Sequence, residues 1–282
     1  MSHEEKIKEV LARLSSENEL SCAYFKKHSV MVPSRNEVVK IIKKIQHLIF
    51  PEYFSLDEDK GKTLNKIADE VFLLLKQQLT ASYFFFDEDS VVDTESVAYE
   101  ILDMLPEIKA KLLKDVLALY EGDPAARSPE EIILSYPGFY AISIYRIAHE
   151  FYVRKIPYIA RLMTEFAHEK TGIDIHAGAT IGEYFFIDHG TGIVIGETTT
   201  IGDRVKIYQG VTLGAKSFEL DEDGNPVKGI KRHPDIGNGV VIYANATILG
   251  GNTKIGDGCV IGGNVWLTHS VPAGEVVYYN AK

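Results

Sequence analysis

Aliphatic residues return every six positions along residues 175 to 266 of this chain. The ladder begins with a run that breaks only at Thr199, and its members are Ile175, Ile181, Ile187, Ile193, Val205 and Val211. After a polar interval it resumes one residue out of phase, breaks again at Lys254, and comprises Ile236, Ile242, Ile248, Val260 and Trp266. A period of six fits neither a helix nor a simple strand, but it fits a chain that turns a corner after each short strand. The pattern predicts a parallel β-helix of hexapeptide repeats whose stacked coils share one apolar core.

The chain before the ladder has the spacing of amphipathic helices. Apolar residues recur three and four positions apart in the segments 7–14, 38–49, 64–75, 97–105 and 108–119. Ser34 and Glu37 have the spacing of a capping box, and Ser128 followed by proline marks a further helix start. One last helical stretch is expected from Pro137 to near Gly172.

These patterns predict an α+β fold, in which an all-α domain at 1–172 precedes a β-helix domain at 173–270 and a tail at 271–282. Residues 216–231 lack apolar periodicity and contain Asp-Gly-Asn-Pro, so they are expected to form a loop extruded from one corner. The acidic segment 57–59, like 87–89, is expected to be a solvated turn without the spacing of an EF-hand.

The composition narrows the choice of partners and compartment. A net charge of −10 argues against a nucleic acid or an anionic membrane as partner. No apolar run approaches the roughly 20 residues that span a bilayer, and the start of the chain lacks a secretory pattern. Cys22 and Cys259 lie far apart, so no structural disulfide is expected. We therefore expect a cytoplasmic protein.

Charged pairs beside the ladder are the candidates for chemistry, because a β-helix does not need them for stability. His189 is the best candidate for a general base, since imidazole titrates near neutral pH. Asp174 precedes it by about one circuit of the coil and could orient its ring. Arg232 offers a planar fork for a carboxylate, while Asp123 and Asp188 offer anions for an ammonium group. This set suits an amino acid that carries a hydroxyl.

Other histidines are weaker candidates. His176 is interpreted as a surface corner residue, and His149 and His168 as ordinary helix residues. His233 is intermediate, because it lies where the loop 216–231 returns to the coil.

Several stretches of the chain resemble serine O-acetyltransferases of cysteine synthesis. They are DIHAGATIG (174–182), IDHGTGIVIGET (187–198), YQGVTLGA (208–215) and KRHPDIG (231–237), with GDPAARSP (122–129) and PGFYAISIYRIAH (137–149) upstream. The resemblance implies a left-handed parallel β-helix that forms a homotrimer or a dimer of trimers. It also implies transfer of acetyl from acetyl-CoA to L-serine, with no metal, and feedback inhibition by L-cysteine.

The resemblance also implies roles for single residues. His189 matches the base and Asp174 its partner, while Asp123, Asp188, Arg232 and His233 match the serine-binding set, His233 reaching across from a neighbouring subunit. The residues that match the coenzyme groove are Gly214, Ala215 and Ala244. The loop 216–231 is longer and more acidic than in the family, and the chain ends without a terminal isoleucine. A sulfhydrylase partner is therefore not expected.

Three other functions remain open from the residues alone. A related acetyltransferase for a sugar or other hydroxyl would keep His189 but has no need of Arg232 and two aspartates. A γ-type carbonic anhydrase would use His176, His189 and His233 as zinc ligands, although their spacing differs from that family. A trimeric scaffold without catalysis would need none of these charged pairs.

Overall fold

The computed structural model describes residues 1–16 and 31–279, and the chain divides into two compact units, Met1–Val32 and Pro33–Lys282. In the first unit, helix α1 (His3–Ser15) begins at a complete capping box formed by Ser2 and Glu5. No residue of α1 is buried. Cys22 lies outside the described residues. The domain boundary at residue 172 stays a prediction.

The second unit begins with a series of helices, most of which the apolar spacing predicts. In chain order they are α3 (Arg35–Ile49), the short 3-10 helix η1 (Asp57–Asp59), α4 (Leu64–Phe86), α5 (Thr94–Asp103), α6 (Leu105–Gly122), α7 (Pro129–Ser135), α8 (Pro137–Val153) and α9 (Ile159–Thr171). Ser128 caps α7 through the backbone N–H of Glu131, as expected. Ser34 caps α3 in the same way, but its own N–H donates to Gln78 Oε1 at 2.8 Å. The predicted capping box is therefore only half formed.

Two expectations about the helical part are wrong. The stretch from Pro137 is interrupted between α8 and α9, where Lys155 and Tyr158 adopt left-handed φ values of 56° and 61°. Pro157 lies in this break, where its missing N–H and its ring disfavour a continuous helix. Asp59, expected in a solvated turn, is buried, and its carboxylate pairs with the ammonium groups of Lys44 and Lys62.

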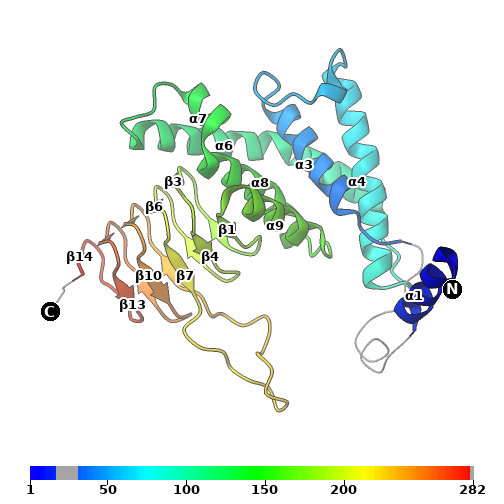
Figure 1. Ribbon diagram of the computed structural model, residues 1–282. Coiled ribbons are helices and arrows are strands. Elements are labelled where there is room, and N and C mark those ends of the chain that lie inside the picture. The colour runs from blue at the N-terminus through cyan, green and yellow to red at the C-terminus, as the bar shows by residue number, and fades with distance from the viewer. Residues whose placement is uncertain (17–30, 280–282) are drawn as a thin grey trace. The chain divides into compact units, whose positions relative to one another are not determined.

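The rest of the second unit is a parallel β-helix of three faces, which confirms the predicted order of helices followed by coil (Figure 1). The first face contains β1 (Asp174–Ile175), β4 (Val194–Ile195), β7 (Thr212–Gly214), β10 (Thr247–Leu249) and β13 (Trp266–Leu267). The second contains β2 (Thr180–Ile181), β5 (Thr200–Ile201), β8 (Asp235–Ile236) and β11 (Lys254–Ile255). The third contains β3 (Phe186–Asp188), β6 (Lys206–Tyr208), β9 (Val241–Ile242), β12 (Val260–Ile261) and β14 (Val276–Val277).

The inward row of the coil differs from the predicted ladder after Ile187. On the first face, the aligned residues are Ile175, Ile195, Leu213, Ile248 and Leu267. The step from Ile187 to Ile195 is therefore eight residues, because two extra residues lie in the turn that begins at His189. Ile193 and Thr199 are still buried, since each lies two positions before an inward strand residue.

A second slip shifts the end of the ladder. The step from Ile248 to Ile255 is seven residues, so the inward position passes from Lys254 to Ile255 and from Trp266 to Leu267. Trp266 is 68% exposed, whereas Leu267 is 3% exposed. Lys254, which interrupts the predicted ladder, therefore points outward.

The helices are joined to the first coil through a buried ion pair. Arg146 of α8 donates to both carboxylate oxygens of Asp115 in α6, at 2.5 and 2.8 Å. Arg146 also donates to the carbonyl of Gly182, and Asp115 accepts from the backbone N–H of Phe185. Both charges are thereby neutralised where α6 and α8 meet the coil.

The loop between β7 and β8 leaves the coil and projects from it, as the sequence predicts for residues 216–231 (Figure 1). Asp221 closes a turn inside the loop by accepting from the backbone N–H groups of Asp223 and Asn225. Across the described ranges, none of the helices is both long and apolar enough to cross a membrane.

Candidate active site

Two corners of the coil hold the candidate residues. The His189 corner comprises the turns that lead from a third-face strand to the next first-face strand: 189–193, 209–211, 243–246 and 262–265. The Arg232 corner comprises the turns from the first to the second face: 176–179, 196–199, 215–234 and 250–253. The first face separates the two corners in each coil.

His189 occupies the lengthened turn of the His189 corner, directly after β3. Its backbone has φ 57°, and its side chain is 70% exposed, so the ring projects outward. The imidazole Nε2 lies 3.7 Å from Asp188 Oδ2. A ring that is this accessible can reach a substrate hydroxyl, as a general base must.

Asp123 joins this corner from the end of α6. One oxygen of its carboxylate accepts from the Tyr136 hydroxyl at 2.5 Å, and the other accepts from the backbone N–H of Ala125 at 2.8 Å. The hydrogen bonds from Tyr136 and from the backbone N–H of Ala125 lower the pKa of Asp123, and the nearby His189 lowers it a little further. The bond between Tyr136 and Asp123 also raises the pKa of Tyr136 to about 12. Asp123 is therefore anionic at neutral pH and suits an ammonium group.

Asp174 lies at the start of β1, one coil below, opposite Val194. Its backbone N–H donates to Ile193, in the same turn as His189. No hydrogen bond or ion pair joins the Asp174 and His189 side chains within residues 31–279. The role of Asp174 as the partner of the base remains a prediction.

Arg232 belongs to the other corner, where the long loop returns to the coil. Its guanidinium pairs with Glu197, which follows β4, and Glu197 also accepts from the Tyr152 hydroxyl at 2.7 Å. Burial favours the protonated acid, but the donors Tyr152 and Arg232 outweigh it and hold the pKa of Glu197 low. The guanidinium is thus oriented by a fixed carboxylate.

His233 follows Arg232 and is 7% exposed. Its Nδ1 lies 2.9 Å from the Thr198 hydroxyl and accepts from the Thr198 N–H at 3.1 Å. Because Nδ1 accepts, the proton of the neutral ring is on Nε2. Burial and the adjacent Arg232 lower the pKa of His233 to about 4. The ring is neutral at physiological pH.

Gly196 gives the His233 ring its space. A Cβ at this position would lie 2.1 Å from His233 Cδ2, so Gly196→Ala is expected to displace the ring and to cost about 1–3 kcal/mol of unfolding free energy. Denaturant-induced unfolding should measure this loss of stability. In a His233→Ala background the same change should cost little stability, and an equal cost in both backgrounds would contradict the assignment.

No protein-family model matches the chain. A plasmid-encoded serine acetyltransferase of Synechococcus elongatus is 46% identical over an alignment of 260 residues that covers 87% of this chain and 81% of that protein. A serine acetyltransferase of Bacillus subtilis is 45% identical over 179 residues, covering 61% of this chain and 78% of that protein. The chain belongs to the serine acetyltransferase family. Members of this family are acetyl-CoA-dependent O-acetyltransferases.

Solved structures of the family have the same fold. Serine acetyltransferase 1 of Entamoeba histolytica in complex with L-cysteine superposes with a TM-score of 0.73 at 36% identity, covering 97% of both chains. The Neisseria gonorrhoeae serine acetyltransferase in complex with serine gives a TM-score of 0.58 at 28% identity, over 85% of this chain and 95% of that one.

The residues that the sequence leads us to expect in a coenzyme groove fall on both corners. Gly214 and Ala215 lead into the Arg232 corner, and Ala244 lies in the His189 corner. All three are partly exposed, and a Cβ on the neighbouring Gly263 would lie 3.2 Å from the Ala244 carbonyl. Small side chains and accessible backbone at these positions fit an extended arm that approaches closely.

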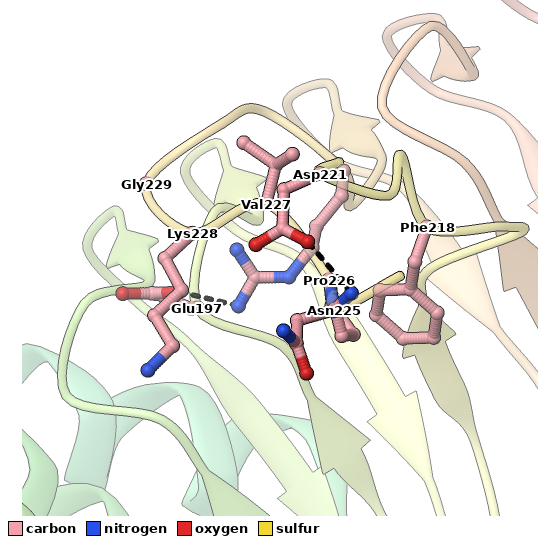
Figure 2. Close-up of a pocket in the computed structure, with 9 residues that line it drawn as sticks. Glu197, Phe218, Asp221, Asn225, Pro226, Val227, Lys228 and Gly229 are labelled. Atoms are coloured by element: carbon pink, nitrogen blue, oxygen red, sulfur yellow. Dashed lines mark hydrogen bonds and ion pairs between the residues drawn. The ribbon is translucent and has the colours of Figure 1, made fainter. Parts of the chain in front are cut away.

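The long loop forms a pocket of about 810 Å³ beside Arg232 (Figure 2). Figure 2 shows Glu197 and Lys228 close together on one side of the pocket, Phe218 on the other side, and Asp221 between them. The family resemblance did not predict this pocket, because the loop is the segment that departs from the family.

The histidines considered as zinc ligands do not gather. His176 and His233 lie on the Arg232 corner, whereas His189 lies on the other. Within residues 1–16 and 31–279, no three His, Cys, Asp or Glu side chains are close enough to hold one metal ion. His176 packs edge-on against Tyr152, and burial lowers its pKa.

Proposed function

We propose that the protein transfers the acetyl group of acetyl-CoA to the hydroxyl of L-serine, giving O-acetyl-L-serine and CoA in cysteine biosynthesis. The observation that carries the proposal is the 46% identity to a serine acetyltransferase over 260 residues. The site chemistry supports it, since Asp123 and Asp188 suit an ammonium group and Arg232 suits a carboxylate.

We further propose that the site is completed by a second copy of the chain. Within one chain, the base and its aspartates lie on the His189 corner, while Arg232 and His233 lie on the Arg232 corner across the first face. A homotrimer, or a dimer of trimers, that places unlike corners against each other brings the two sets together around one serine. The positions Gly214, Ala215 and Ala244 would meet in the same groove and line the arm of the coenzyme.

The chain's own residues account for the proton movements. His189 accepts the proton of the serine hydroxyl as the oxygen attacks, and later delivers a proton to the departing sulfur. Asp174 would orient the imidazole and stabilise its protonated form. Bound acetyl-CoA supplies the activated thioester. The neutral Nε2–H of His233 can donate a hydrogen bond to the substrate.

The same contacts support inhibition by L-cysteine. Cysteine has the ammonium and carboxylate groups of serine, so Asp123, Asp188 and Arg232 would bind it equally well. The Entamoeba histolytica relative has been solved with L-cysteine. We therefore propose that cysteine competes with serine at this site.

The test is thiol release from acetyl-CoA, followed with a thiol-reactive dye, with L-serine or a panel of sugars and amines as acceptor. We expect release with serine and little with the panel, because only serine offers both charges beside its hydroxyl. Release with a sugar alone would keep the base and discard the serine assignment. Absence of release with every acceptor would contradict the proposed function.

A further inference from the structure

Helix α8 packs against the first coil near both corners. Its N-terminal turn packs on β3, where a Cβ on Gly138 would lie 2.5 Å from the Ile187 carbonyl oxygen. Near its other end, Tyr152 packs over the turn after β1, where a Cβ on Gly178 would lie 2.7 Å from the Tyr152 ring. With 17 residues, α8 is about 25 Å long, enough to extend from the His189 corner to the Arg232 corner.

A tyrosine hydroxyl near each end of α8 contacts a carboxylate at one of the two corners. At the N-cap, Tyr136 donates to Asp123 Oδ2 at 2.5 Å. Four turns later, Tyr152 donates to Glu197 Oε1 at 2.7 Å, and the other oxygen of Glu197 pairs with Arg232. Each hydroxyl therefore fixes one carboxylate: Asp123 itself, or the carboxylate that orients Arg232.

The middle of α8 is fixed to the coil, so its ends cannot move independently. The buried ion pair of Arg146 with Asp115, together with the donation from Arg146 to the carbonyl of Gly182 in the first coil, holds the helix in place. Tyr145 adds a single hydrogen bond, to the carbonyl of Ala179 at 2.5 Å, so its loss alone leaves the helix in position. The helix is thus a rigid support whose two ends are set relative to the coil.

We propose that α8 positions both halves of the acceptor site, with Tyr136 holding Asp123 for the ammonium group and Tyr152 holding Glu197 and, through it, Arg232 for the carboxylate. This inference rests on the proposed function. It makes Tyr136 and Tyr152 positioning residues, since neither contacts the reacting atoms, and it adds Glu197 to the residues that set acceptor affinity.

The test compares Tyr136→Phe and Tyr152→Phe with Tyr145→Phe. Each removes one hydroxyl that is hydrogen-bonded in the structure, but the Tyr145 hydroxyl contacts no carboxylate of the site. For the first two variants we expect the KM for serine to rise about tenfold, because each loses one hydrogen bond to a charged group. The KM for acetyl-CoA should not change. Tyr145→Phe should lower thermal stability and leave the KM for serine as in the wild type.

The pH profile gives a second readout for Tyr136. The hydroxyl lowers the pKa of Asp123 because it donates to the ionised form. Without it the pKa rises, so the further loss of kcat/KM for serine that protonation of Asp123 causes, below the limb set by the general base, should begin at higher pH in Tyr136→Phe and stay in place in Tyr145→Phe. If Tyr136 had only a structural role, its replacement would lower kcat/KM by the same factor at every pH and leave the start of this further loss in place.

The double variant tests whether the two halves are independent. Tyr136→Phe and Tyr152→Phe act on different charges of the substrate, so their effects on kcat/KM should multiply. Unchanged serine KM values and pH limbs in both variants, or changes matched by Tyr145→Phe, would overturn the inference. Wild-type enzyme that does not use serine at all would instead overturn the proposed function.

Discussion

Replacement of His189 by asparagine is expected to lower kcat for serine by about 10²- to 10⁴-fold, the usual contribution of a general base. The fold should be unaffected, since the side chain is 70% exposed and asparagine tolerates the left-handed backbone at φ 57°. Steady-state thiol release measures the loss. His269→Asn, at an exposed histidine of a later turn, is the matched control. Equal activity in both variants would remove His189 from the proton transfer.

The second large effect concerns folding. Asp115→Ala is expected to lower the free energy of unfolding by about 3–5 kcal/mol, because it leaves the Arg146 guanidinium buried without its counterion. Denaturant unfolding monitored by circular dichroism measures this loss.

Lys114→Met is the matched control for Asp115→Ala. It breaks the neighbouring ion pair with Glu183, whose side chains are 36% and 37% exposed, and should change stability by less than about 1 kcal/mol. If the two variants lost similar stability, the buried pair would not be what joins α6 and α8 to the coil.

The β-helix could be predicted from the sequence because its period appears in residue types alone. The register beyond Ile187 could not, because residues two positions before each inward strand residue, such as Ile193 and Val205, are also apolar and buried. Counting by six therefore continued smoothly through the extra residues of the His189 corner. Only strand pairing shows that Ile195, not Ile193, is aligned with Ile175.

The charged residues of the candidate site stand out in the sequence, but the groups that hold them do not. His189, Asp188 and Arg232 stand out beside an apolar ladder and match the family motifs. Glu197 lies within a motif too, yet nothing in the sequence connects it with Tyr152, 45 positions earlier, or with Arg232, 35 positions later. Such partners become visible only when the coils stack.

The apolar spacing predicts most of the helical segments, but it does not predict the break between the last two helices or the burial of Asp59. The apolar spacing predicts one helix that continues through Pro157, but Pro157 lies in the break between α8 and α9. Burial of Asp59 could not be predicted either, because its pairing with Lys44 depends on how η1 folds back against α3.

The inner row of the coil returns to alignment after interruptions of very different length. The step from Ile187 to Ile195 contains two extra residues, and the step from Leu213 to Ile236 contains the whole projecting loop, yet Ile201 and Ile236 are neighbours on the second face. The β-helix therefore tolerates changes in the length of its corner turns without a change in the pairing of its strands. In evolutionary terms, new chemistry can be inserted at a corner, as at His189 and in the loop before Arg232, while the selection that maintains the core acts on other residues.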